Sequence, residues 1–134
     1  MSDASCDRPL AGSTCPTLDP ACLEQLRELD PLGGVTFLRK VLATYLRSLD
    51  AQRDHVLVSG AQADWPALSQ AAHGLKSASA SVGALGLSRL CASLEEAVRQ
   101  RQFECISSLV REFDAESLRV RLAVQSQLSL EGAA

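Results

Sequence analysis

Hydrophobic residues recur at steps of three, four or seven along most of this 134-residue chain. This spacing places them on one face of an α-helix, whereas the alternation typical of strands is absent. The pattern predicts a short helix that starts at Asp19 and Pro20, then four long helices over about 34–59, 64–82, 84–101 and 103–127. Short connections between these helices favour antiparallel neighbours. We therefore expect an all-α fold, an antiparallel up-down four-helix bundle with an additional short N-terminal helix.

The ends of the chain lack this periodicity, which suggests a single packed domain between them. Residues 1–18 mix Ser, Asp, Gly and Pro, and we expect a flexible N-terminal arm there. Residues 19–128 should form the bundle domain, and residues 129–134 a disordered C-terminal tail.

Composition narrows the classes of partner. A formal net charge of −3 and the lack of a Lys/Arg stripe argue against nucleic acid binding. No stretch approaches the roughly 18 to 20 apolar residues of a membrane span, and the N-terminus does not resemble a signal peptide. We expect a cytoplasmic protein with protein partners. The five cysteines form no CxxC pair and no zinc-spaced cluster with histidine, so reduced thiols and no bound metal are expected.

The stretch AAHGLKSASASVGAL, residues 71–85, places His73 among small residues and off the apolar stripe of its helix. Its neighbours on the helix surface are Gln70, Lys76, Ser77 and Ala80. An exposed neutral imidazole offers a lone pair that can attack an activated phosphoryl group, and Lys76 would offset the added charge. Small neighbours would let a partner's active site approach the ring. The alternative is that this stretch has no functional role, because a surface histidine beside a lysine is common and runs of small residues often mark only close helix packing.

The motif AHGLKSASASVGA (residues 72–84), followed by LSRLCASLE (87–95), resembles the histidine-containing phosphotransfer (HPt) domain of bacterial two-component phosphorelays. The similarity extends over roughly residues 20–125. It implies signal transduction by a phosphoprotein in which His73 accepts a phosphoryl group from a receiver-domain aspartate and transfers it to another receiver aspartate. Lys76 would then be the phosphoryl charge partner. Glu95 would hold one ring nitrogen and orient the imidazole, unless it is only a solvated glutamate.

The resemblance also suggests where a partner would dock. The candidate partner-binding residues on the motif helix are Gln70, Gly74, Ser77, Ala80 and Gly83. Exposed apolar residues near Leu32 and Phe37 would complete this surface. Many family members have glycine where this chain has Ser77, whose hydroxyl slightly crowds the approach to the ring.

The source of the phosphoryl group must be another protein, because the chain has no nucleotide-binding loop. We expect a phosphotransfer protein without autokinase activity, a monomer whose partners are receiver domains of response regulators, a hybrid sensor histidine kinase, or both. It would need no cofactor, since Mg²⁺ would belong to the receiver's acidic pocket. The alternative is a helical adaptor that docks receivers without phosphotransfer. A bundle enzyme or metal protein is disfavoured, because the two histidines are isolated and no Glu-x-x-His motif is present.

Overall fold

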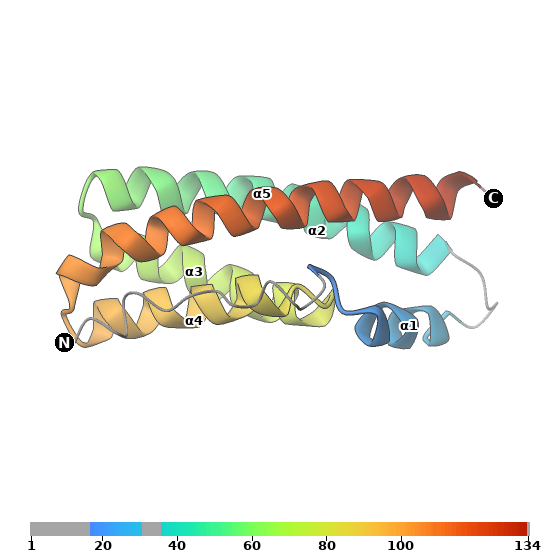
Figure 1. The fold of residues 1–134 in the computed structure, drawn as a ribbon, viewed down its shortest axis with the longest axis horizontal. Coiled ribbons are helices and arrows are strands. Elements are labelled where there is room, and N and C mark those ends of the chain that lie inside the picture. Colours follow the sequence, from blue (N-terminus) through green and yellow to red (C-terminus); the bar gives the residue numbers. More distant parts are fainter. Residues whose placement is uncertain (1–16, 31–35, 134) are drawn as a thin grey trace.

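A computed structural model describes residues 17–30 and 36–133 of the chain. The described residues form five helices and no strand: α1 (Pro20–Glu28), α2 (Thr36–Ala61), α3 (Trp65–Ser81), α4 (Leu85–Arg99) and α5 (Phe103–Ala133) (Figure 1). The predicted all-α bundle with a short N-terminal helix is therefore confirmed. Most of the predicted arm, residues 1–16, lies outside the described residues.

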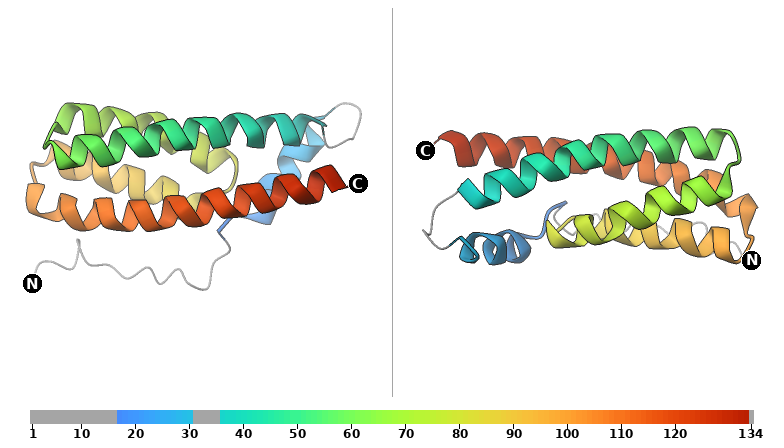
Figure 2. Two further views of the ribbon diagram at one scale, coloured as in Figure 1. Left: turned by 90° about the horizontal axis from the view of Figure 1, so that it is seen from above. Right: turned by 180° about the vertical axis from the view of Figure 1, so that it is seen from behind.

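The four long helices pack in a ring, because α3 contacts α2 and α4 while α5 contacts the same two helices. Consequently α3 and α5 occupy opposite corners of the bundle. The α3–α4 half is shorter than the α2–α5 half, and α1 lies beyond the turn that joins α3 to α4, against α2 (Figure 1 and Figure 2). The short helix thus extends the shorter half of the bundle.

The core is almost entirely aliphatic, as the low aromatic content requires. Fully buried side chains come from every long helix: Leu38, Leu42, Leu49, Leu68, Leu75, Leu87, Leu94, Ile106 and Phe113. Complete burial of such a side chain contributes about 1.5 to 3 kcal/mol. These residues are those on the apolar stripes of the sequence, so the helix faces follow directly from the hydrophobic pattern.

Helix starts also follow the sequence signals. The Asp19 carboxylate accepts a hydrogen bond from Ala21 N at 3.0 Å, and the Asp64 carboxylate accepts one from Ala67 N at 3.3 Å. Each cap satisfies an amide that the first helical turn leaves without a partner, and a proline stands in the first turn of each helix. The predicted starts of α1 and α3 are therefore confirmed.

Three expectations need correction. The last helix continues to Ala133, so 129–133 are helical instead of a disordered tail, because nothing before Gly132 disfavours a helix. Leu18 is buried at 8% exposure, so the packed domain starts before Asp19. Cys22 and Cys91 are free thiols, but Cys105 is disulfide-bonded. The expectation of reduced thiols rested on the number and spacing of the cysteines, which do not show whether the fold brings two distant cysteines together.

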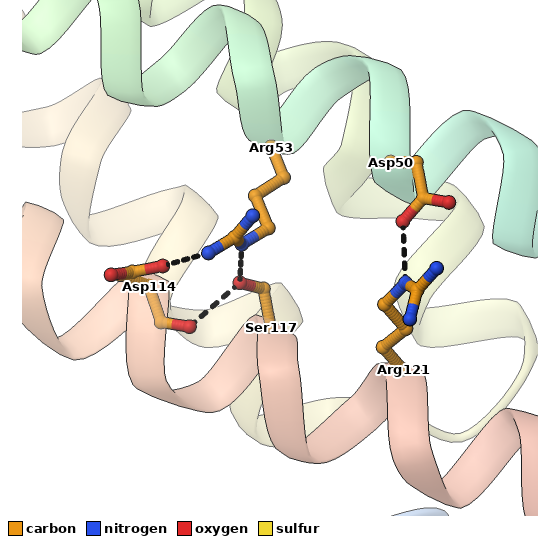
Figure 3. Close-up of polar contacts among 5 residues, drawn as sticks. All are labelled: Asp50, Arg53, Asp114, Ser117 and Arg121. Carbon is orange, nitrogen blue, oxygen red and sulfur yellow. Dashed lines mark hydrogen bonds and ion pairs between the residues drawn. The ribbon is translucent and has the colours of Figure 1, made fainter.

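Polar contacts fix the register between α2 and α5 (Figure 3). Arg53 Nε donates to Ser117 Oγ at 3.1 Å, and the Arg53 guanidinium also pairs with the Asp114 carboxylate. Ser117 Oγ donates to the Asp114 carbonyl at 2.9 Å. One turn further along, Arg121 Nε donates to Asp50 Oδ1 at 2.9 Å. This seam lies opposite the α3–α4 seam, where the candidate site is found.

Candidate functional site

His73 lies in the middle of α3, and its side chain is 71% exposed. The other face of this helix supplies buried residues to the core, among them Ala72, Leu75 and Ser79. The imidazole therefore points away from the core, as the hydrophobic pattern predicts.

The helix that carries His73 is held by polar contacts on both sides. On the α2 side, the hydroxyl groups of Tyr45 and Ser79 share a buried hydrogen bond of 2.8 Å. On the α4 side, Ser88 Oγ donates to the carbonyl oxygen of Lys76 at 3.0 Å. Burial raises the pKa of Tyr45 well above its usual value, so its hydroxyl stays protonated. These contacts limit rotation and sliding of α3 beneath the site.

Glu95 of α4 contacts the imidazole directly: its Oε2 lies 2.8 Å from His73 Nδ1. An ionised carboxylate can only accept, so Nδ1 carries the proton and donates. The other ring nitrogen, Nε2, then keeps its lone pair on the exposed ring. In the neutral ring the contact thus selects the tautomer with an unprotonated Nε2, a nitrogen that could act as a nucleophile.

The same carboxylate also binds Lys76, whose Nζ lies 2.6 Å from Glu95 Oε1. Oε1 is fully buried, and the Lys76 ammonium group beside it provides the compensating charge. Burial raises the pKa of Glu95, but hydrogen bonds and positive charge from Lys76 and His73 outweigh that effect and hold the pKa below its usual 4.5. Glu95 is therefore ionised at neutral pH.

The predicted docking residues do not all lie on the exposed surface. Gln70, Gly74 and Ser77 are exposed beside His73, and Ala80 is half-buried. Gly83 is buried at the end of α3, with a φ of 88°. A Cβ there would lie 2.7 Å from the backbone nitrogen of Asp19.

The backbone of the fold itself favours glycine at position 83. Gly83 adopts the left-handed conformation, and its carbonyl accepts a hydrogen bond from Asp19 N at 2.9 Å. Its proposed part in a docking surface is therefore corrected. Of the two apolar positions expected nearby, Phe37 is half-buried in the first turn of α2, and Leu32 lies outside the described residues.

One neighbour of the site was not predicted from the sequence. Gln52 of α2 extends its side chain over Gly74, so that its amide nitrogen lies 3.8 Å from where a Gly74 Cβ would be. It is half-buried and borders the residue next to His73. Nothing in the local sequence of α2 marks this position, because the contact depends on how α2 packs against α3.

No cluster of three or more His, Cys, Asp or Glu side chains that could hold a metal ion occurs within 17–30 and 36–133. Over the same residues, every helix is too short or too polar to span a membrane.

The fold and the site together define a helical-bundle protein with an exposed histidine that contacts a carboxylate, which in turn pairs with a lysine. The sequence matches the family model of the Hpt domain over residues 38–126. The chain therefore belongs to the Hpt domain family and is a histidine phosphotransfer intermediate of phosphorelays, a class of proteins that interacts with receiver domains.

A solved structure with the same fold is that of histidine-containing phosphotransfer protein B (HptB) from Pseudomonas aeruginosa PAO1. The two chains are 23% identical, and the TM-score is 0.77 over 86% of this chain and 96% of that one. No curated protein sequence gave a significant match.

Proposed function

We propose that His73 is the phosphoacceptor of this Hpt domain, and that it takes the phosphoryl group from an aspartate of one receiver domain and passes it to an aspartate of another. The observation that carries the proposal is the Glu95 contact to Nδ1 on a ring that is 71% exposed. In the neutral ring, that contact leaves Nε2 with a lone pair that can attack phosphorus.

In the first transfer, the Nε2 lone pair forms a bond to phosphorus while the bond between phosphorus and the aspartate oxygen breaks. The electron pair of that bond returns to the receiver's carboxylate. Because Nδ1 keeps its proton, the product ring is an imidazolium, whose charge faces the Glu95 carboxylate. Transfer to the next receiver reverses these steps, and Mg²⁺ would be held by the receiver.

Lys76 is the proposed charge partner of the phosphoryl group. Phosphorylation adds about two negative charges to the side chain. Lys76 lies one helical turn from His73 and contacts the same carboxylate as the imidazole, so its ammonium group can reach the phosphoryl oxygens.

The proposed docking surface is the exposed part of α3 around His73, formed by Gln70, Gly74 and Ser77 with Ala80 at its edge. Small residues beside the ring would let the rim of a receiver's active site approach closely.

The partners of the protein would be response regulators, a hybrid sensor kinase, or both. The chain would act as a cytoplasmic monomer. It would have no kinase activity of its own, since its sequence contains no nucleotide-binding loop.

The test is transfer of labelled phosphate from a phosphorylated receiver. Wild-type protein should gain label that is labile to acid and stable to base, as expected for phosphohistidine, and His73→Gln should gain none. His55→Gln is the matched control, because His55 is an exposed histidine on α2 that pairs with no carboxylate of the described residues, and it should label normally. Label retained in His73→Gln would overturn the assignment. Absence of transfer from every receiver of the source organism would favour the adaptor alternative.

A further inference from the structure

We infer that Glu95 exchanges cations during phosphotransfer: it holds Lys76 in the unphosphorylated protein and the His73 imidazolium in the phosphorylated one, which releases Lys76 to the phosphoryl group. Glu95 would thus be a positioning residue for both side chains of the site. The inference rests on the proposed role of His73 as phosphoacceptor.

Each oxygen of the Glu95 carboxylate contacts a different side chain. Oε2 is 2.8 Å from His73 Nδ1, and Oε1 is 2.6 Å from Lys76 Nζ. The Glu95 side chain is only 22% exposed, while that of His73 is 71% exposed. Glu95 is therefore fixed between α3 and α4, beneath a reactive ring that faces outward.

Charge balance differs between the two states. Attack by Nε2 requires the neutral ring, and in that state the positive charge of Lys76 balances the negative charge of Glu95. After transfer the site carries about two additional negative charges on the phosphoryl group and one positive charge on the imidazolium. The carboxylate and the phosphoryl group then each have a cation of their own only if Lys76 pairs with the phosphoryl group and the imidazolium pairs with Glu95.

Of the side chains of His73, Lys76 and Glu95, that of Lys76 is the one that can move toward the phosphoryl group. Its side chain is 35% exposed and ends in a compact ammonium group on a flexible stem. Glu95 cannot follow the phosphoryl group outward, because its carboxylate has one oxygen fully buried. Since the ammonium and the imidazole contact the same carboxylate, Lys76 needs only a change of side-chain rotamer to reach a phosphoryl group on Nε2.

This arrangement gives substitutions at Lys76 two effects. Removing the ammonium group takes a cation from the phosphoryl group, and it also leaves a partly buried carboxylate without its partner next to the incoming negative charge. A second substitution that neutralises Glu95 should therefore relieve part of the damage. The effects of the two substitutions on the transfer rate should not be independent.

The experiment compares transfer rates from one phosphorylated receiver for the wild type, Lys76→Ala, Glu95→Gln and the double variant. We expect the double variant to transfer on the order of tenfold faster than the product of the two single effects predicts. Multiplicative effects would overturn the inference while leaving His73 labelling of the wild type, and so the proposed function, intact. The matched control is Glu96→Gln with Arg99→Ala, which removes an exposed ion pair on α4 away from the imidazole and should leave the rate unchanged.

A direct readout follows the Lys76 side chain by NMR. Its ε-CH₂ signals should shift when wild-type protein is phosphorylated, and in unphosphorylated Glu95→Gln they should already resemble those of solvated lysines. Signals that stay the same on phosphorylation would contradict the exchange. If Lys76→Ala fails to fold, as judged by circular dichroism, Lys76→Met keeps the aliphatic stem and serves in the same cycle.

Discussion

Gly74 lies beside His73, and no contact within 17–30 and 36–133 explains its small size. Glycine inside a helix costs about 0.5 to 1 kcal/mol relative to alanine. Among the described residues, a Cβ at this position would meet only the Gln52 side chain, at an ordinary contact distance of 3.8 Å. The described part of the fold would therefore accept alanine, and the glycine is consistent with the proposed close approach of a receiver.

Gly74→Ala should stabilise the protein and slow its function. We expect the free energy of unfolding in urea to rise by about 0.5 to 1 kcal/mol, and phosphotransfer from a receiver to fall severalfold because the new methyl group lies in the docking surface. Ser107→Ala, an exposed helix substitution on α5, is the control and should leave transfer unchanged. Wild-type transfer by Gly74→Ala would remove Gly74 from that surface.

The sequence predicted those parts of the site that lie on one helix. His73 and Lys76 are a turn apart on α3, so helical spacing alone placed them together, and the family resemblance pointed to Glu95 on the next helix. Gln52 was missed because its contact with Gly74 depends on packing between helices. Gly83 was given the wrong role, since spacing cannot distinguish a small residue needed by a partner from one needed by the backbone of Asp19.

At the scale of helices, the boundaries given by caps and prolines were predictable, and contacts between helices were not. The amphipathic stripes show which face of α2 and α5 is buried, but not how far one helix is displaced along the other. In the structure that register is fixed by Arg53, which reaches the buried Ser117 and the more exposed Asp114 (Figure 3). The Asp50–Arg121 pair in the same seam is more exposed.

Arg53→Ala should therefore cost more stability than Arg121→Ala. Arg53 is 27% exposed and makes two polar contacts to α5, so its loss should lower the free energy of unfolding by about 1 to 2 kcal/mol. Arg121 and Asp50 are 38% and 48% exposed, and this pair should contribute less than about 1 kcal/mol. Urea titration measures both values. Equal losses would contradict a special role for the Arg53 contacts, and neither variant should alter transfer, because the seam is opposite His73.

At the scale of the whole molecule, Cys91 connects chemical reactivity with stability. It is fully buried on α4, and burial, followed by the nearby Glu95 charge, raises its pKa to about 12. Only the thiolate attacks alkylating reagents. The folded bundle therefore protects this thiol in two ways, because it keeps the reagent away from the sulfur and keeps the thiol protonated. Cys22 on α1 is half-buried and gives an internal comparison.

We expect iodoacetamide at pH 8 to modify Cys91 only through opening of the bundle, and therefore much more slowly than Cys22. A variant that loses about 1.4 kcal/mol of stability should speed modification of Cys91 about tenfold, if the opening is global. Peptide mass spectrometry of quenched samples measures both rates. Cys91 modification as fast as that of Cys22, or insensitive to Arg53→Ala, would show that α4 opens locally instead.

The exposure of the His73 ring has a kinetic consequence. With respect to the described residues 71% of the side chain is open to solvent, so we expect the rate of relay to be governed by collisions between partners and by the fraction of collisions that are correctly oriented. The same openness lets water reach the phosphoryl group. A carrier built in this way exchanges phosphate readily with any well-matched receiver, and it holds the signal only for as long as hydrolysis is slower than the next encounter.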